Sequence, residues 1–155
     1  MQSDSITIIR AGPGDVEPIA LLFDLYRQFY EQSGDPDGAR AFIGERMDHD
    51  ESVIFLAMNI DGGVDEPAGF VQLYPIFSSV RMIRVWLLND LFVHPDHRRH
   101  GIGRLLMDRS IIHARDTGYG RLELATTSDN REARRLYESL GFVREEGFEH
   151  YSLSV

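Results

Sequence analysis

Apolar and polar positions in the first third of the chain follow two periods, one typical of strands and one typical of helices. Residues 6–9 are a β-branched run that predicts a first strand. After a turn at residues 12–14, apolar positions recur every three or four residues, which predicts a helix that ends before the break at residues 33–36. A second helix is expected over residues 39–49, because its apolar side chains again fall on one side.

The middle of the chain predicts three strands joined by short connections. Strands are expected over residues 53–60, 68–74 and 85–93, with a tight turn at 61–63 and a loop over 75–83. The last of these strands is almost continuously apolar, as expected of a strand that is covered on both faces.

The last third predicts two helices and three short strands. A glycine-containing turn at residues 98–103 leads into one helix, and the other lies between a cap at residues 129–130 and Gly141. Short strands are expected over residues 122–126, 142–144 and 150–155. The order is therefore β-α-α-β-β-β-α-β-α-β-β, which predicts an α/β (α+β) fold in a single domain over residues 1–155.

Composition excludes several kinds of chemistry. All 16 cationic residues among the 155 are Arg, so a Schiff-base lysine and a Lys-dependent phosphate loop are excluded. The lack of Cys excludes a disulfide framework, a thiolate zinc site and a cysteine nucleophile. A net charge of −9 disfavours nucleic-acid binding, which needs a basic face. No apolar run approaches the ~18 residues of a membrane span, and residues 1–5 lack a signal-peptide pattern. We therefore expect a cytoplasmic protein without membrane attachment.

The net negative charge of the chain comes from one part of the sequence. Residues 1–90 carry 6 Arg against 15 Asp and Glu, whereas residues 91–155 carry 10 of each kind. Because a cleft lined by one sign of charge concentrates ligands of the opposite sign, this division favours two ligands of different charge.

The most specific local feature is the segment RRHGIG at residues 98–103, which follows the apolar strand and opens a helix. The first amides of a helix have no intrahelical partner, and the helix dipole adds positive potential there. The two glycines would let a pyrophosphate approach these amides closely, and the two arginines together with Arg104 add cationic donors. A plain strand-to-helix turn is the alternative. A dinucleotide-binding pattern fails at Leu106, where its third glycine would stand.

Two segments together resemble the GNAT superfamily of N-acetyltransferases. Arg98, Gly101 and Gly103 stand at the positions of its R/Q-x-x-G-x-G/A motif, and the preceding NDLFVHP at residues 89–95 resembles its fourth strand, as in diamine- and polyamine-type members. Residues 130–142 resemble a second motif of the family. The resemblance implies a GNAT-like mixed, mostly antiparallel central sheet of about six to seven strands flanked by about four helices.

The resemblance also implies where acetyl-CoA would bind. A fourth strand that splays from the fifth would offer backbone groups to the pantetheine arm, and the amides of residues 99–104 would hold the pyrophosphate. Asn130 would hydrogen-bond the pantetheine from the start of a later helix. The cofactor-binding residues implied in this way are Leu91, Phe92, Val93, Arg98, Arg99, His100, Gly101, Ile102, Gly103, Arg104, Asn130, Ala133 and Tyr137.

Catalytic roles follow from the same resemblance. Tyr137 would stand near the thioester sulfur, and a phenol with a pKa of about 10 can protonate a departing thiolate. The alternative is that Tyr137 only packs with the other apolar residues on its face of the helix. Asn89 stands where polyamine-acetylating relatives carry Glu, and the adjacent Asp90 would point to the opposite face unless a bulge re-aims it. Glu31, Glu123 or a water chain are further candidates for the base.

Three histidines at positions 94, 97 and 100 are spaced by three, which invites a metal interpretation. They fall around a proline-containing loop without a nearby carboxylate of fixed geometry, so no metal is expected. Two of them, His97 and His100, are expected to flank the phosphate site.

Aromatic residues beside acidic ones suit a cationic acceptor. Tyr30 and Glu31 at the end of the first helix are the expected acceptor-binding pair, with Trp86 as a further candidate, while core packing is the alternative for each aromatic residue.

The sequence thus predicts an N-acetyltransferase that moves the acetyl group of acetyl-CoA directly to a primary amine of a cationic small molecule, such as a polyamine, diamine or aminoglycoside-like amine. A non-catalytic acyl-CoA sensor and a peptide or protein N-acetyltransferase are the alternatives. A homodimer is expected from the habit of the family.

Overall fold

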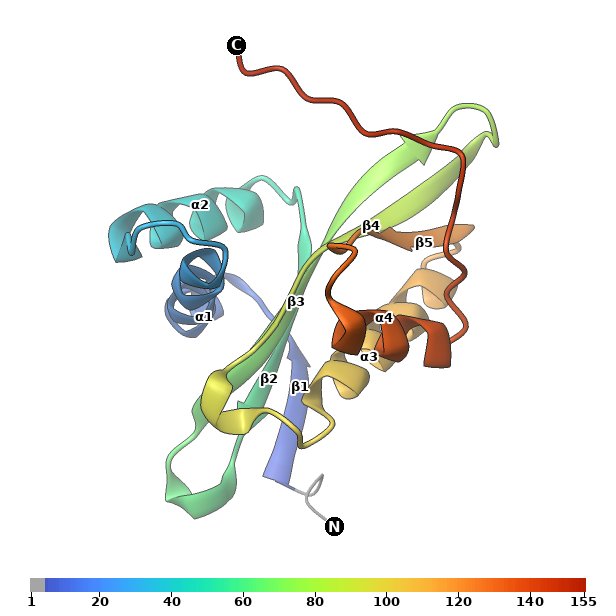
Figure 1. Ribbon diagram of the computed structural model, residues 1–155. Coiled ribbons are helices and arrows are strands. Elements are labelled where there is room, and N and C mark those ends of the chain that lie inside the picture. Colours follow the sequence, from blue (N-terminus) through green and yellow to red (C-terminus); the bar gives the residue numbers. More distant parts are fainter. Residues whose placement is uncertain (1–4) are drawn as a thin grey trace. The chain divides into compact units, whose positions relative to one another are not determined.

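The computed structural model describes residues 5–155 (Figure 1). Residues 1–4, which belong to the stretch without a signal-peptide pattern, lie outside the described residues. The chain divides into two compact units: unit 1, which ends at Ala125, and unit 2, Thr126–Val155. None of the described helices combines the length and the apolarity that crossing a bilayer requires.

Unit 1 is built on one mixed sheet of five strands. The strands lie in the order β1-β2-β3-β4-β5, and each neighbouring pair is antiparallel except the parallel pair of β4 and β5. Their bounds are β1 Ile6–Arg10, β2 Val53–Asn59, β3 Glu66–Ser78, β4 Ile83–Val93 and β5 Arg121–Leu124. The sequence patterns therefore predicted all five of these strands.

The prediction of a loop over residues 75–83 is wrong for most of that range. Strand β3 continues to Ser78 and β4 begins at Ile83, so only four residues connect them. Pro75, the first residue of this range, pairs with Trp86 within the ladder. Long-range pairing of two strands has extended the hairpin beyond the point at which local turn signals predict its end.

Helices cover both faces of the sheet in unit 1. Helices α1 and α2 lie on one face and α3 lies on the other (Figure 1), and α4 belongs to unit 2. The helix bounds are α1 Val16–Phe29, α2 Pro36–Asp48, α3 Ile102–Asp116 and α4 Arg131–Ser139, with short 3-10 turns at Pro13–Asp15, Asp61–Gly63 and Pro95–His97.

Successive residues of each strand divide between these two layers. Ile54, Leu56 and Phe70 are buried against the apolar sides of α1 and α2. The intervening Phe55 contacts the ring of His113 on α3, with 5.4 Å between the ring centroids. Burial on both faces explains why the central strands are apolar without a clear alternation.

Gly69 sets the distance between β3, β4 and α3. A Cβ atom at this position would lie 2.8 Å from the carbonyl oxygen of Phe92 and 3.3 Å from a methyl group of Ile102. The first turn of α3 can therefore approach the end of β4 only because Gly69 has no side chain.

The predictions of two last strands, over residues 142–144 and 150–155, are wrong. The described residues of unit 2 form α4 and then an extended segment without strand pairing. Alternating apolar residues are compatible with a strand, but a strand forms only where a partner satisfies its backbone groups. The fold is a mixed α/β arrangement with one sheet of five strands and four α-helices, not six to seven strands.

Replacing Gly69 with Ala is expected to lower the free energy of unfolding by about 1–3 kcal/mol, because the added methyl overpacks the junction of β3, β4 and α3. Gly44→Ala is the control: it lies within α2 with no atom within 4 Å of its Cβ position, and it is expected to raise stability by up to about 1 kcal/mol. Urea unfolding measures both effects. A Gly69→Ala variant as stable as the parent protein would contradict the assignment.

Candidate functional site

The end of β4 has one open edge. Pairing between β4 and β5 runs from Val85 to Leu88 and stops there, whereas β4 continues to Val93. On its other side, β4 stays paired with β3 as far as Val93. Among the described residues, the outer edge of residues 89–93 therefore has no strand partner, so its backbone groups can bind an extended ligand. An unpaired end of β4, which the resemblance implies, is therefore found in unit 1, because β5 ends at Leu124.

The turn after β4 contains two residues in the left-handed backbone region and leads into the N-terminus of α3. Arg99 and Gly101 both have positive φ, at 64° and 76°, and Gly101 stands at the N-terminal cap of α3. The Leu105 amide donates to the Gly101 carbonyl at 3.1 Å, so the amides of Ile102 and Gly103 precede the first helical donor. No atom lies within 4 Å of a Cβ position at Gly101. The geometry suits a bound anion.

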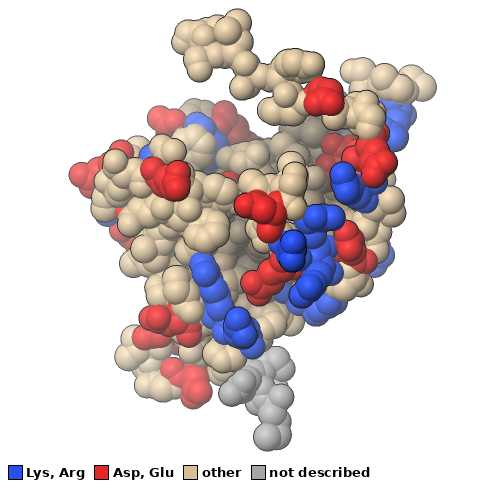
Figure 2. All heavy atoms as spheres, viewed as in Figure 1, with Lys and Arg blue, Asp and Glu red and all other residues tan. Residues whose placement is uncertain are grey.

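Arg98 ties this turn to the end of the strand. Its Nε donates to the Val93 carbonyl at 3.1 Å, and its guanidinium carbon lies 5.7 Å from the ring centroids of both Phe29 and Phe92. Arg99, His100 and Arg104 are exposed. Figure 2 shows basic side chains at the turn ahead of α3 and acidic side chains over the helices α1 and α2.

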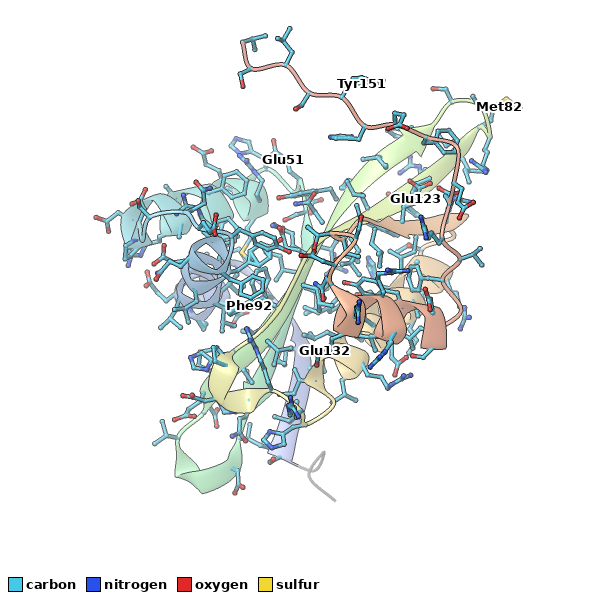
Figure 3. All side chains as sticks on the ribbon, viewed as in Figure 1. Glu51, Met82, Phe92, Glu123, Glu132 and Tyr151 are labelled. Atoms are coloured by element: carbon cyan, nitrogen blue, oxygen red, sulfur yellow. The ribbon has the colours of Figure 1, made fainter. Side chains whose placement is uncertain are left out.

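A β-bulge directs Asp90 towards α1. Gln72 pairs with Asp90 and Leu73 pairs with Leu88, so Asn89 is the extra residue. Without the bulge, Leu88 and Asp90 would share a face; with it, Asp90 lies on the face of Phe92, which contacts α1 (Figure 3). The sequence analysis expected Asp90 to point to the other face unless a bulge re-aims it, and that bulge is present.

The Asp90 carboxylate lies in a buried polar cluster. Its Oδ2 accepts from Gln72 Nε2 at 2.8 Å and its Oδ1 accepts from Asn89 Nδ2 at 3.1 Å, and Tyr26 also hydrogen-bonds it. Burial raises the pKa of Asp90 above that of an exposed carboxyl, and the hydrogen bonds partly oppose this shift. Burial, together with the charge of Asp90, raises the pKa of Tyr74 to about 12.

Aromatic rings connect this cluster to the end of α1. The ring centroid of Tyr26 lies 6.0 Å from that of Phe92 and 5.1 Å from that of Tyr30. Glu31 follows with a positive φ of 63° and is exposed. The structure therefore brings Tyr30 and Glu31 to the face of unit 1 that carries Asp90.

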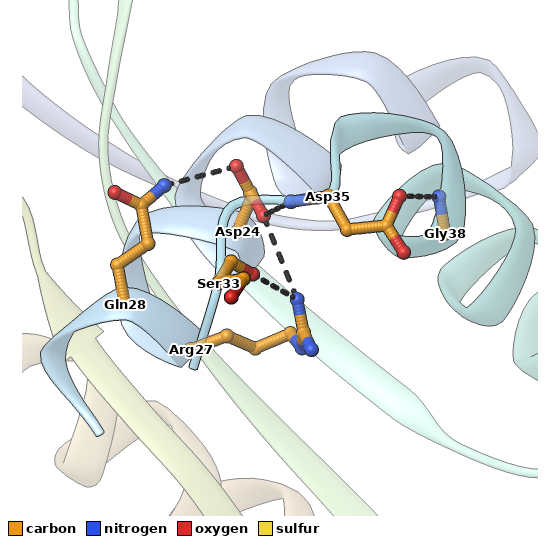
Figure 4. Close-up of polar contacts among 6 residues, drawn as sticks. All are labelled: Asp24, Arg27, Gln28, Ser33, Asp35 and Gly38. Atoms are coloured by element: carbon orange, nitrogen blue, oxygen red, sulfur yellow. Dashed lines mark hydrogen bonds and ion pairs between the residues drawn. The ribbon is translucent and has the colours of Figure 1, made fainter. Parts of the chain in front are cut away.

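The loop after Glu31 is held by a buried carboxylate on α1 (Figure 4). Asp24 Oδ1 accepts from the Asp35 amide at 2.7 Å, and Asp24 Oδ2 accepts from Gln28 Nε2 at 3.1 Å. Asp35 in turn caps α2 by accepting from the Gly38 amide at 2.9 Å. These bonds fix the position of the segment between α1 and α2.

Trp86 lies on the other face of the sheet. Its Nε1 donates to Thr117 Oγ1 at 2.9 Å, and its ring stacks on Tyr119 with 4.3 Å between centroids. It also contacts His113 of α3. The structure does not bring Trp86 together with Tyr30 and Glu31.

The remaining expected site residues lie on α4 in unit 2. Asn130 caps this helix, because its side-chain oxygen accepts from the Ala133 amide at 3.2 Å. Ala133 and Tyr137 are four residues apart and share one helix face. The ring of Tyr137 lies 6.1 Å from that of Phe142, whose amide donates to the Tyr137 carbonyl.

The histidines after β4 contact each other and one carboxylate. The rings of His94 and His97 lie 5.7 Å apart, and His97 Nε2 lies 3.5 Å from Glu66 Oε2. In the part of the chain that the structure describes, no group of three His, Asp or Glu residues could hold a metal ion.

Tyr26 and Tyr74 were among the aromatic residues that the sequence offered as an acceptor lining, with core packing as the alternative, whereas Gln72 of the Asp90 cluster was not found from the sequence. One signal could have indicated it. Gln72 is a fully buried amide in the otherwise apolar middle of β3, and a polar residue at such a position needs a polar partner.

Known proteins resemble this chain along nearly its whole length. The acetyltransferase (GNAT) family model matches residues 19–142. YhfO, an uncharacterized N-acetyltransferase of Bacillus subtilis (strain 168), is 45% identical over 150 residues, which cover 97% of this chain and 98% of YhfO.

Solved structures agree with this result. One of them is the crystal structure of a probable acetyltransferase, whose sequence is 37% identical to this chain. The two superpose with a TM-score of 0.87 over 96% of this chain and 97% of the other chain. An aminoglycoside N-acetyltransferase, AAC(6')-Iy, in complex with CoA has a TM-score of 0.78 and covers 97% of this chain and 95% of its own. Because it is only 20% identical, it supports the fold alone. The open edge of β4, the glycine-containing turn ahead of α3 and these matches lead to one conclusion: the chain belongs to the GNAT family of acetyltransferases.

Proposed function

We propose that this acyl-CoA-dependent N-acetyltransferase transfers the acetyl group of acetyl-CoA directly to a primary amine of a cationic small molecule. The observation that carries the proposal is the open edge of β4, which leads into the amide-lined turn at Gly101 within the same unit. An extended chain that ends in a pyrophosphate matches this combination of a free strand edge and an anion site.

In this proposal, the backbone of Leu91, Phe92 and Val93 holds the pantetheine arm, and the turn holds the pyrophosphate. Arg98 keeps the turn attached to the strand through the Val93 carbonyl. Acetyl-CoA supplies an activated acyl group when bound. The chain's own contribution to the pyrophosphate site is the amides of residues 99–104 with the side chains of Arg99, His100 and Arg104. Asn130, Ala133 and Tyr137 of α4 complete the proposed cofactor set.

The proposed acceptor site is the Asp90 side of the sheet. The buried carboxylate, the Tyr30 ring and the exposed Glu31 offer negative charge beside aromatic surface, which suits an ammonium group. The whole net acidic excess of the chain comes from residues 1–90, the part of the sequence that contains Tyr30, Glu31 and Asp90. Trp86 packs between β4 and α3 instead, so we assign it a packing role rather than an acceptor role.

The chemistry assigned to these residues is direct transfer. Asp90 accepts a proton from the ammonium group, and Asn89 orients Asp90 by donating to its Oδ1. The neutral nitrogen then forms a bond to the acetyl carbon and loses its second proton to solvent as the carbon–sulfur bond breaks. A backbone N–H near Val93 polarises the carbonyl, and Tyr137 donates its phenolic proton to the departing thiolate. The lack of Cys excludes an acyl-cysteine intermediate.

Incubation with acetyl-CoA and a panel of amines tests the proposal. We expect thiol release with diamines, polyamines or aminoglycoside-like amines, because the acceptor side carries negative charge, and little release with acidic amino acids. Isothermal titration with CoA is run in parallel. CoA binding without thiol release from any amine would instead favour an acyl-CoA sensor, and release with peptides alone would favour a peptide N-acetyltransferase.

Tyr137→Phe is expected to lower kcat by about 10²-fold or more, because removal of a positioned general acid usually has an effect of this size. The KM for acetyl-CoA should change little, since the ring is retained. Tyr119→Phe removes a phenol that packs elsewhere, against Trp86, and should leave kcat unchanged. Steady-state kinetics at saturating amine provide the comparison. Equal kcat values for Tyr137→Phe and the parent enzyme would rule out this role.

Asp90→Asn is expected to reduce kcat/KM by about 10²-fold and to alter the pH profile. Burial raises the pKa of Asp90, so the parent enzyme should lose activity as the pH falls through that raised value, where the carboxylate becomes protonated. The Asn variant should lack this acid limb.

The matched control for Asp90→Asn is Asp24→Asn, which removes another buried carboxylate on the same side of the sheet. This control should lower the melting temperature, because the segment between α1 and α2 loses its anchor, but keep the acid limb. An acid limb that persists in Asp90→Asn would show that another group is the base.

A further inference from the structure

Gln72 is a buried amide in an otherwise apolar stretch of β3. Its side chain is fully buried, and so are its neighbours Val71 and Leu73. The Nε2 atom of Gln72 donates to Asp90 Oδ2 at 2.8 Å, whereas its Oε1 atom is buried and accepts no hydrogen bond from the described residues. A buried acceptor without a donor lowers stability, so packing alone does not account for an amide at this position.

The register of the sheet holds Gln72 against Asp90. The two residues pair directly across β3 and β4, next to the bulge at Asn89. Because cross-strand partners have neighbouring side chains, the backbones of two strands keep the Gln72 donor at the carboxylate. Asn89 also donates to Asp90, at 3.1 Å, but the Asn89 side chain is exposed. Gln72 is therefore the more firmly held of these two donors.

The other groups that act on the Asp90 carboxyl are neutral. Tyr26 of α1 hydrogen-bonds it, and Tyr74 of β3 keeps its proton because its pKa is raised to about 12. The charged residues near the end of α2 that act on Tyr74 are Arg46 and Glu51, and they pair with each other at 2.7 Å. Burial therefore opposes the charge of Asp90, and hydrogen-bond donors rather than cations support it.

Three donors leave one position on the carboxylate open. An ionised carboxyl has about four lone-pair positions, and the donors described above occupy three of those on Asp90. The fourth is the position that an N–H of an ammonium substrate can take. Without the Gln72 donor, the buried carboxyl would take up a proton at a higher pH, and the neutral acid could no longer accept one from the substrate.

We propose that Gln72 is a positioning residue that acts through Asp90. Its amide keeps the carboxyl ionised and holds Oδ2, so that one lone-pair position stays open to the acceptor amine. This inference rests on the proposed function, because it gives Gln72 a role in the reaction only through the proposed base. It implies that the side chain at position 72 sets the lowest pH at which the enzyme works.

The first test follows the Asp90 carboxyl directly, by carbon-13 NMR of protein labelled at aspartate, with the signal assigned through Asp90→Asn. Gln72→Met removes the donor at similar volume and should raise the titration midpoint of Asp90 by about one pH unit. Gln72→Glu puts a second carboxyl in place of the donor and should raise the midpoint further, because the two acids compete for one proton. An unchanged midpoint in both variants would overturn the proposal.

The matched control is Leu73→Met, which alters the next buried residue of β3 on the opposite face of the sheet. It should leave the midpoint of Asp90 unchanged. Circular dichroism checks that each variant is folded. Gln72→Glu keeps the shape of the side chain, so it provides the same test if Gln72→Met does not fold.

The second test is the pH profile of kcat/KM with an amine that the enzyme accepts. In Gln72→Met the acid limb should move to higher pH by the same amount as the NMR midpoint. Above this limb, kcat/KM should return to within a few-fold of the parent value, because Asp90 is then ionised again. A loss of kcat/KM that is equal at every pH would indicate a purely structural role for Gln72 and contradict the proposal.

The two measurements separate this inference from the proposed function. A parent enzyme without an acid limb, in which the Asp90 carboxyl nevertheless titrates, would overturn the base role of Asp90 and with it the role of Gln72 in the reaction. An acid limb that Asp90→Asn abolishes, but that neither Gln72 variant moves, would leave Asp90 as the base and overturn the role of Gln72 alone.

Discussion

The single extra residue at Asn89 determines how this sheet presents its polar groups. On the N-terminal side of the bulge, Trp86 and Leu88 face α3; beyond it, Asp90 and Phe92 face α1. A regular strand would have placed Asp90 with Leu88, buried among apolar side chains without its partners. The bulge therefore converts an unfavourable buried charge into a hydrogen-bonded one, and it lies next to the point where β4 leaves β5. Both features of the candidate site, the carboxylate and the open edge, depend on this region.

Two other constraints support the same end of β4. Gly69 lets the first turn of α3 come close to the Phe92 carbonyl, which places the amides of the turn near the end of the strand. Arg98 fixes the turn from the other side by donating to the Val93 carbonyl while its guanidinium rests against two aromatic rings. The candidate site thus depends on the backbone conformation at the end of β4 and on a few polar contacts. Among the connecting segments, it uses mainly the turn between β4 and α3, which Arg98 holds to the strand.

Local patterns predicted the five strands, the four helices and the glycine turn ahead of α3, because each depends on nearest neighbours in sequence. They failed where pairing partners decide the outcome. Pro75 lies within a ladder rather than a loop, and the alternation over residues 150–155 does not produce a strand in a chain that offers it no partner. Trp86 shows the same limit: its residue type suits an amine site, but its position in the register points it at Thr117 and Tyr119.

The sequence by itself determined the family, the glycine-containing turn ahead of α3 and the uneven distribution of charge along the chain, since motifs, glycine positions and charge are properties of the linear chain. Only the tertiary structure decided which face Asp90 takes, which residues surround it and where β4 loses its neighbour. The physical reason is that a one-residue bulge reverses the facing of every later side chain in a strand, and its position is set by long-range pairing between β3 and β4 rather than by the residues at the bulge.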